Sequence, residues 1–302
     1  MSHIPPIPPA ARGARDWFLA LRPWSFPASA MPVLLSLAYF YQAGPTPDAA
    51  HGALALASVL LIHAAGNLWS DVFDYRSGVD AHDTEGVRVL ALGRFSVAEY
   101  LGLAALLAAA GSALCGVLAA RLGSDLLLAG AAGLAAGLLY PPLKYRAWGD
   151  AVIFAAYTVT PLLAMGRIVT GEWTLSAWPA LLPAGVLTVA ILMANNLRDM
   201  ETDARAGIQT LAIALGARRA KTLLKAEYAL SFALALSAVV AGALPVTALA
   251  VLGALVPLAK LLKTLDAPEA RYARLDEATA ALQLVFSLLM VIGLAAARLL
   301  PG

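Results

Sequence analysis

Three carboxylates follow directly after an uncharged apolar segment near residue 70. Residues 49–70 contain no Asp, Glu, Lys or Arg, and Asp71, Asp74 and Asp80 come next, in the sequence NLWSDVFDYRSGVD. A carboxylate beside hydrocarbon is costly unless something binds it, so ionisable residues at such places commonly mark functional sites. These residues are therefore candidate ligands for a cation.

A second acidic stretch has a similar spacing and also follows an apolar segment. It reads NNLRDMETDARAGIQT over residues 195–210, where Asn195 and Asp199 match Asn67 and Asp71. We interpret the match as a weak internal repeat. On a helix, residues spaced three or four apart, or multiples of this, share one face. Two such faces, which we expect to look into one cavity, carry Asn67, Asp71 and Asp74, and Asn195, Asp199 and Asp203.

The two stretches offer oxygen ligands and contain no His or Cys. Such ligands suit Mg²⁺, which proteins typically hold with one or two carboxylates and substrate phosphates. This points to a diphosphate substrate. Arg88, Lys144 and Arg198 are available to bind the remaining phosphate charge. A membrane location then favours a substrate with a long apolar tail.

The composition places these stretches in a membrane protein. Of the 302 residues, 61% are hydrophobic and 13% are charged, and the mean hydropathy is +0.76, well outside the range of ordinary soluble domains. The net charge of +2 and the absence of a long basic run exclude a nucleic-acid partner. One cysteine, Cys115, allows no intramolecular disulfide.

Charge-free runs of the length of a bilayer-spanning helix predict the architecture. The run at 228–259 has Gly242 and Pro245 near its middle and is expected to form two helices. We therefore predict an all-α bundle of nine transmembrane helices around a central cavity open to the cytoplasm. The eight runs are 23–47, 49–70, 100–120, 126–143, 151–166, 173–197, 228–259 and 278–297. Residues 1–16 form a polar, proline-rich leader, and residues 17–302 form one transmembrane domain.

The distribution of basic residues predicts the orientation. With a cytoplasmic N-terminus, only Arg121, Arg167 and Arg298 of the 21 Lys and Arg residues fall outside, a strong positive-inside asymmetry. Both acidic stretches then lie at the cytoplasmic ends of helices in the cell (inner) membrane.

Several other polar residues have a simpler explanation. His51 and His63 have no matching partner in the sequence, so we expect them to pack or to lie at the interface. We interpret Glu227 and the pair Asp276-Glu277 as a hydrated rim.

The sequence resembles the UbiA superfamily of membrane prenyltransferases from Leu21 to about Leu299. Four elements occur in the order that the superfamily shows. The matching residues are Ser70, Asp71 and Asp74 in the first motif, Asp199 and Asp203 in the second, Tyr140 and Lys144 in a Tyr-x-x-x-Lys element, and Arg88 in the loop after the first motif.

The branch that prenylates 1,4-dihydroxy-2-naphthoate for menaquinone biosynthesis is the most similar. It shares Asn67, the Gly-x-Asp ending at Asp80, and the Asn-Asn-x-x-Asp beginning at Asn195. Ser70 stands where the superfamily usually has Asn, and Ile208-Gln209 stands where a Lys is common. These departures leave the acceptor open.

The resemblance implies transfer of a polyprenyl group from its diphosphate to an aromatic quinone precursor, with Mg²⁺ as cofactor and release of pyrophosphate. The implied metal ligands are Asp71, Asp74, Asp199 and Asp203, with Ser70 and Asp80 in support. The implied diphosphate-binding residues are Asn67, Arg88, Tyr140, Lys144, Asn195 and Arg198.

Two alternatives remain open. Another acceptor, such as 4-hydroxybenzoate, a haem or chlorophyll ring or a glyceryl lipid, would use the same site. An ion-coupled transporter would also need carboxylates, but transporter sites lie near the bilayer midplane on broken helices, whereas both acidic stretches here end apolar runs.

Overall fold

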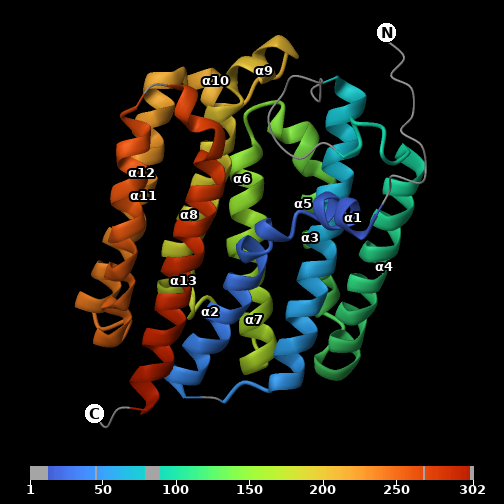
Figure 1. Cartoon of the computed structure of the whole chain (residues 1–302). Coiled ribbons are helices and arrows are strands. Elements are labelled where there is room, and N and C mark those ends of the chain that lie inside the picture. The colour runs from blue at the N-terminus through green and yellow to red at the C-terminus, as the bar shows by residue number, and fades with distance from the viewer. Residues whose placement is uncertain (1–12, 45, 79–88, 268, 300–302) are drawn as a thin grey trace.

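The computed structural model describes residues 13–44, 46–78, 89–267 and 269–299 (Figure 1). Helices make up nearly all of the described residues, and among these no strand forms beyond one isolated bridge between Arg146 and Gln209. The predicted all-α class is confirmed.

The helices follow one another through short connections. A π-helical turn, Ala155–Val159, joins α6 to α7, and a 3₁₀ segment, Val246–Ala254, runs directly into α12. The α-helices are α1 Ala14–Leu21, α2 Pro27–Ala43, α3 Ala49–Ser77, α4 Val97–Leu122, α5 Leu126–Lys144, α6 Gly149–Phe154, α7 Thr160–Thr170, α8 Trp178–Arg198, α9 Met200–Arg205, α10 Leu211–Leu215, α11 Ala217–Val240, α12 Leu255–Leu265 and α13 Leu275–Leu299.

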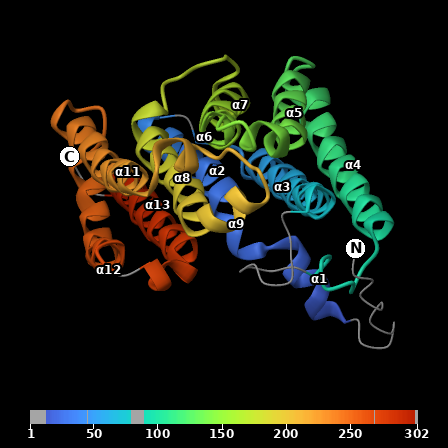
Figure 2. The same ribbon diagram turned by 90° about the horizontal axis from the view of Figure 1, so that it is seen from above.

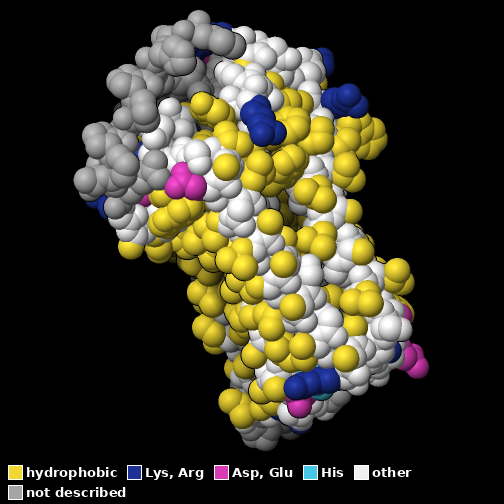
Figure 3. Space-filling view, turned by 90° about the vertical axis from the view of Figure 1, so that its right-hand side faces the viewer, with side chains coloured by type: hydrophobic (Ala, Val, Ile, Leu, Met, Phe, Trp, Pro, Cys, Tyr) yellow, Lys and Arg dark blue, Asp and Glu magenta, His cyan; other side chains and the backbone are white. Residues whose placement is uncertain are grey.

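Eight helices among the described residues are long and apolar enough to cross a membrane. They include separate spans on either side of the turn at residues 241–245, as expected from Gly242 and Pro245. The helix α2 has 17 residues, at the lower limit of a spanning helix, so the prediction of nine spans stays a prediction. On the face shown in Figure 3, charged side chains gather toward the two ends and hydrophobic ones lie between them.

The helix α8 occupies the centre of the packing. It is the most deeply buried of the candidate spans, and it packs against α11, α13, α6 and α2. Viewed from above, α8, α13 and α2 lie between α11 and α12 on one side and α3, α4 and α5 on the other (Figure 2). Helices α3 and α8, which carry the acidic stretches, both contact α2 and lie on either side of the middle of the bundle (Figure 2).

Local signals place the ends of these two helices at the acidic residues. Helix α3 is capped by Gly78, whose φ of 75° is the left-handed conformation that glycine adopts without strain. Helix α8 is capped by Asp199, and the short helix α9 begins at Met200 in a new direction (Figure 1). The second stretch is therefore two helices and not the continuous one that its spacing suggested.

A small residue permits the close contact between α13 and the 3₁₀ segment. A Cβ atom on Gly293 would collide with the carbonyl oxygen of Thr247 and lie 3.0 Å from the Cα atom of Ala248. Both neighbours are backbone atoms, so neither can rotate away. Small residues at such crossings are typical of membrane helix packing.

We expect Gly293→Ala to lower the free energy of unfolding by about 1–3 kcal/mol, the usual cost of overpacking. The measurement is thermal unfolding in detergent, followed by the fluorescence of the six tryptophans. The control is Gly116→Ala in α4, where a Cβ atom meets nothing within 4 Å. An unfolding temperature of Gly293→Ala equal to that of Gly116→Ala would contradict the prediction.

Candidate functional site

A cavity of about 350 Å³ lies among α3, α5, α6, α8, α9 and α13. One part of its wall is apolar and comes from the middle of the helices, with residues such as Ile62, Ile153 and Ile191. The other part is polar and comes from the helix ends. The polar residues are Arg22, Asn67, Ser70, Asp74, Tyr140, Lys144, Asn195, Arg198, Asp199, Thr202, Asp203, Asp276 and Glu277. The cavity therefore has one charged end and one hydrocarbon-like end.

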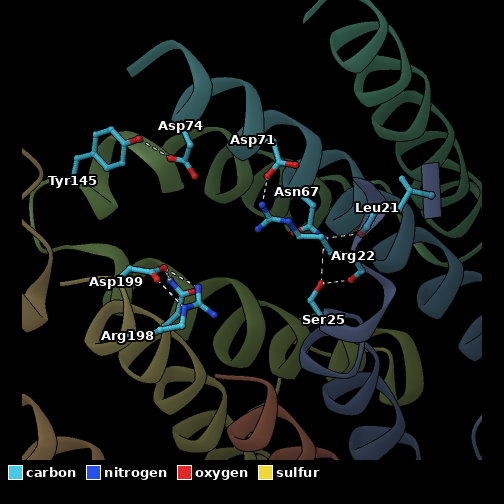
Figure 4. Close-up of polar contacts among 10 residues, drawn as sticks. Leu21, Arg22, Ser25, Asn67, Asp71, Asp74, Tyr145, Arg198 and Asp199 are labelled. Carbon is cyan, nitrogen blue, oxygen red and sulfur yellow. Dashed lines mark hydrogen bonds and ion pairs between the residues drawn. The ribbon is translucent and has the colours of Figure 1, made fainter. Parts of the chain in front are cut away.

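The carboxylate of Asp74 is held by a tyrosine that follows the neighbouring helix α5. The hydroxyl of Tyr145, just after α5, donates to Asp74 Oδ1 at 2.6 Å (Figure 4). Burial and then the neighbouring Asp74 charge raise the pKa of Tyr145, so the hydroxyl keeps its proton and remains a donor. This bond fixes one carboxylate oxygen and leaves Asp74 facing the cavity.

Arg198 is clamped between two carboxylates. Its Nε donates to Asp199 Oδ1 at 2.7 Å and its Nη2 to Asp199 Oδ2 at 2.8 Å (Figure 4). Its Nη1 lies 2.6 Å from Asp276 Oδ2 on α13, and Nη2 also donates to Asn195. The guanidinium thus links the end of α8 to the start of α13, and Asp276 belongs to the site, not to a hydrated rim as expected.

Asp203 is a buried carboxylate with an unsatisfied oxygen. Its exposed fraction is 2%, and its Oδ2 atom has no hydrogen-bond partner among the residues that the structure describes. Burial raises the pKa of Asp203 to about 6, although the charge of Lys144 opposes the shift. A buried anion without a partner is costly, so this position suits a bound cation.

The oxygen donors of the polar end fit Mg²⁺ bound together with a phosphate. Among the described residues, no three His, Cys, Asp or Glu side chains are close enough to hold a metal ion by themselves. Mg²⁺ usually keeps waters and takes only one or two carboxylates, with substrate phosphates completing its shell. Three of the carboxylates that line the cavity, Asp74, Asp199 and Asp203, match that requirement, and the Oδ2 atom of Asp203, which has no hydrogen-bond partner among the described residues, supplies a ready ligand.

Asp71 has a different environment from Asp74. It is 3% exposed and forms an ion pair with Arg22, which lies between α1 and α2 (Figure 4). Asn67, one turn earlier, donates to the carbonyl of Leu21 at 3.0 Å and to Ser25 Oγ at 3.1 Å. These contacts tie α3 to the segment before α2, so Asp71 and Asn67 position Arg22 at the cavity wall.

The structure gathers most of the residues predicted from the sequence around the cavity. Asp71 stands beside it, bound to Arg22, whereas Arg88 and Asp80 lie outside the described residues. The cavity wall includes Asn67, Ser70, Asp74, Tyr140, Lys144, Asn195, Arg198, Asp199 and Asp203.

Sequence reasoning missed Arg22, Tyr145, Asp276 and His63. Arg22 stands alone before the first apolar run and Tyr145 follows Lys144 directly, signals that could have singled them out. His63 has partners from another helix, Ser25 and Ser29, which its own sequence neighbourhood does not reveal.

Comparisons with known proteins agree with this architecture. The sequence matches the UbiA prenyltransferase family over residues 29–282. It is 38% identical to UbiA prenyltransferase domain-containing protein 1 of Danio rerio over 209 residues, or 66% of this chain and 61% of that protein. The same-named protein of Mus musculus is 33% identical over 296 residues, covering 92% of this chain and 83% of that protein. The chain thus spans less than two thirds of the Danio rerio relative.

Solved structures share the fold. A UbiA homolog from Archaeoglobus fulgidus bound to GPP and Mg²⁺ superimposes with a TM-score of 0.62 at 19% identity, covering 94% of this chain and 100% of that chain. The apo structure of a UbiA homolog from Aeropyrum pernix K1 gives a TM-score of 0.61 at 18% identity, with 93% and 98% covered.

The ion pair between Arg22 and Asp71 should contribute measurably to the free energy of unfolding. We expect Arg22→Gln to lower the free energy of unfolding by about 2 kcal/mol, because it removes one partner of the ion pair with the buried Asp71. The cost should stay below that of a fully buried pair, since the Arg22 side chain is 32% exposed. Thermal unfolding without substrate measures it. The double variant Arg22→Gln/Asp71→Asn should recover most of the lost free energy of unfolding. If the double variant were as unstable as Arg22→Gln alone, the ion pair would not be the source of that stability.

Proposed function

The chain belongs to the UbiA prenyltransferase family, and on that premise we propose that it transfers a polyprenyl group from its diphosphate to an aromatic quinone precursor. The observation that carries the proposal is the two-part cavity, with carboxylates and cations from α3, α5, α8 and α9 at one end and an apolar wall at the other. A lipid diphosphate has the same division into a charged head and a hydrocarbon tail. We propose 1,4-dihydroxy-2-naphthoate as the acceptor, because Asn67, Asp80 and Asn195 resemble that branch.

The polar end would bind the diphosphate head. We assign Asp74, Asp199 and Asp203 as the residues that would hold Mg²⁺; the similar structure from Archaeoglobus fulgidus is bound to GPP and Mg²⁺. Bound there, Mg²⁺ supplies charge neutralisation for the leaving diphosphate. Lys144, 9% exposed at the cavity wall, would bind phosphate oxygens and stabilise the negative charge that develops as the C–O bond breaks.

Arg198 and Tyr145 would orient this end of the site. Arg198 keeps Asp199 in place through two hydrogen bonds, and Tyr145 does the same for Asp74. A ligand group locked by such neighbours is presented in one geometry, which reduces the cost of binding. Both carboxylates would then be preorganised from opposite sides of the cavity.

The apolar end would shield the allylic carbon from water. Its wall carries small residues, Gly133, Ala136 and Gly137 of α5, which leave room for an isoprenoid. Excluding water from the reacting carbon prevents its hydrolysis. A volume of about 350 Å³ is at the lower end of small-molecule pockets, so a long polyprenyl tail would extend beyond it into the bilayer.

The arrangement of charges supports a cytoplasmic site. The polar end of the cavity lies at the same end of the helices as α9 and α10, opposite the connection that contains Glu172 (Figure 1). That opposite end carries Arg121, Arg167 and Arg298, the residues that the charge distribution assigns to the outside.

We expect an impermeant maleimide to label Glu201→Cys only in inside-out vesicles and Glu172→Cys only in right-side-out vesicles. Both variants are made in a Cys115→Ala background, which removes the single natural thiol. Both positions are exposed, so access to the reagent depends on the side of the membrane. The opposite labelling pattern would reverse the orientation.

The metal assignment is tested by Asp203→Asn in a transfer assay with Mg²⁺, geranylgeranyl diphosphate and 1,4-dihydroxy-2-naphthoate. We expect product formation to fall about 100-fold or more, the effect of losing one electrostatic contact to the transition state. Thermal stability without substrate should be retained. The substitution removes a buried carboxylate charge, and the Oδ2 atom of Asp203 has no hydrogen-bond partner to lose among the described residues.

The matched control is Glu201→Gln on the same short helix, whose side chain is 87% exposed. It should keep the activity of the unmodified protein. Equal activity of Asp203→Asn and Glu201→Gln would remove Asp203 from the site. If the unmodified protein transferred the prenyl group to 4-hydroxybenzoate and not to the naphthoate, only the acceptor assignment would change.

A further inference from the structure

His63 lies in the wall of the cavity outside the cluster of carboxylates and cations. It is 8% exposed, sits on α3 and contributes to the lining between the polar and the apolar parts. Its ring faces two other aromatic rings, with centroids 5.5 Å away for Phe26 and 5.1 Å away for Tyr157. Nothing in the diphosphate site uses this imidazole.

Hydrogen bonds determine which ring nitrogen of His63 carries the hydrogen. Ser29 Oγ lies 2.8 Å from Nδ1 and donates to the carbonyl of Phe26. Ser25 Oγ lies 3.3 Å from Nε2 and donates to the carbonyl of Arg22. A hydroxyl has one hydrogen and a carbonyl can only accept. Both serine oxygens can therefore accept from the ring, and the contact with Ser29 is the shorter of the two, so we assign the hydrogen to Nδ1 and a lone pair to Nε2, beside Ser25 Oγ.

The position of His63 on α3 brings that lone pair close to the diphosphate end. Asn67 is four residues further along, so it lies about one turn, or about 6 Å along the axis, from His63 and on the same face. Asn67 donates to Ser25 Oγ, the hydroxyl nearest to Nε2. The imidazole therefore stands beside the junction of the charged and apolar parts, where the reacting carbon of a bound prenyl diphosphate would lie.

The π-helical turn Ala155–Val159 supplies the facing ring. Both Ala156 and Tyr157 from this turn line the cavity, and π-helical turns occur frequently at functional sites. The next residue, Thr158, packs on Gly185 of α8 so closely that a Cβ atom there would collide with it. Tyr157 and Phe26 thus give His63 flat apolar neighbours, a setting suited to an aromatic molecule.

We propose that His63 is the acceptor base: Nε2 binds the hydroxyl group of the aromatic acceptor and removes its proton as the ring is prenylated. This inference rests on the proposed prenyl transfer and adds the residue that acts on the acceptor. A neutral imidazole with its hydrogen on Nδ1 and a lone pair on Nε2 is the form that a general base requires, and the acceptor hydroxyl would approach Nε2 beside Ser25.

The acceptor O–H bond breaks and its proton passes to Nε2, while the ring carbon next to that oxygen forms the bond to C1 of the prenyl group. The C1–O bond breaks, and its electron pair leaves on pyrophosphate. The group on the alkylated carbon, a proton or a carboxyl group lost as CO₂, then departs without its electron pair. Return of the proton from Nε2 to the ring oxygen restores the aromatic hydroxyl and the neutral histidine.

The test compares His63→Gln with the unmodified protein, using geranylgeranyl diphosphate and 1,4-dihydroxy-2-naphthoate. General base catalysis contributes about 100-fold or more, so kcat/KM for the acceptor should fall by about that factor. The KM for geranylgeranyl diphosphate should stay within about twofold, which also shows that the variant is folded. The control, His51→Gln, changes the other histidine of α3, twelve residues away and outside the cavity lining, and should have no effect.

An acceptor that is already ionised separates a chemical role from a structural one. With a nitro-substituted acceptor whose hydroxyl is deprotonated at the assay pH, no base is needed, so His63→Gln should lose about tenfold or less. Ser29→Ala, which keeps the imidazole but removes the partner of Nδ1, should show a smaller loss than His63→Gln with the ordinary acceptor.

Two results would overturn the proposal while leaving prenyl transfer intact. One is equal kcat/KM for His63→Gln and the unmodified protein with the ordinary acceptor. The other is the same fold-loss with the ordinary and the ionised acceptor, which would make His63 a packing residue. If the unmodified protein transferred to no hydroxylated aromatic acceptor, the proposed function itself would fail, and the role of His63 would fail with it.

Discussion

Balancing buried charge at the polar end of the cavity is the constraint on which the rest of the arrangement depends. Asp203 and Lys144 are almost fully buried, and they interact electrostatically with each other and with Asp74 and Asp199. Charges removed from water are tolerated only when opposite charges and hydrogen bonds compensate them. Helices α3, α5 and α8 must therefore end at one level, so that their terminal residues can meet across the cavity.

Within the described part of the chain this compensation is incomplete, and this links stability to function. Arg198 is committed to Asp199 and Asp276, and Arg22 to Asp71. Asp203 keeps an unpartnered oxygen, and the cavity wall carries more carboxylates than basic side chains among the described residues. A site with an excess of carboxylates favours the binding of a divalent cation, and the bound cation in turn attracts a diphosphate. The apolar half of the same cavity then selects a diphosphate with a hydrocarbon tail.

The sequence predicted the parts of the fold that depend on local pattern. Apolar runs and the turn at Gly242 and Pro245 correctly indicated helices and the division before α12, and the spacing of Asp74, Asp199 and Asp203 indicated residues that do share one cavity. Contacts between helices that are distant in the sequence could not be predicted from it. Three features depend on how the helices pack against one another, which a single sequence does not show. They are the pairing of Arg22 with Asp71, the contacts of two serines with His63 and the π-helical turn after α6.

The most direct test of the central claim is a crystal structure with Mn²⁺ in place of Mg²⁺ and a non-hydrolysable thiolodiphosphate analogue of geranylgeranyl diphosphate. Manganese can be located by its anomalous scattering. The account predicts a manganese peak at about 2.0–2.4 Å from carboxylate oxygens that include Asp203, with the analogue's phosphates bridging toward Asp74 and its tail along the apolar wall. A peak away from the cavity, or an analogue bound with its tail at the carboxylates, would contradict the account.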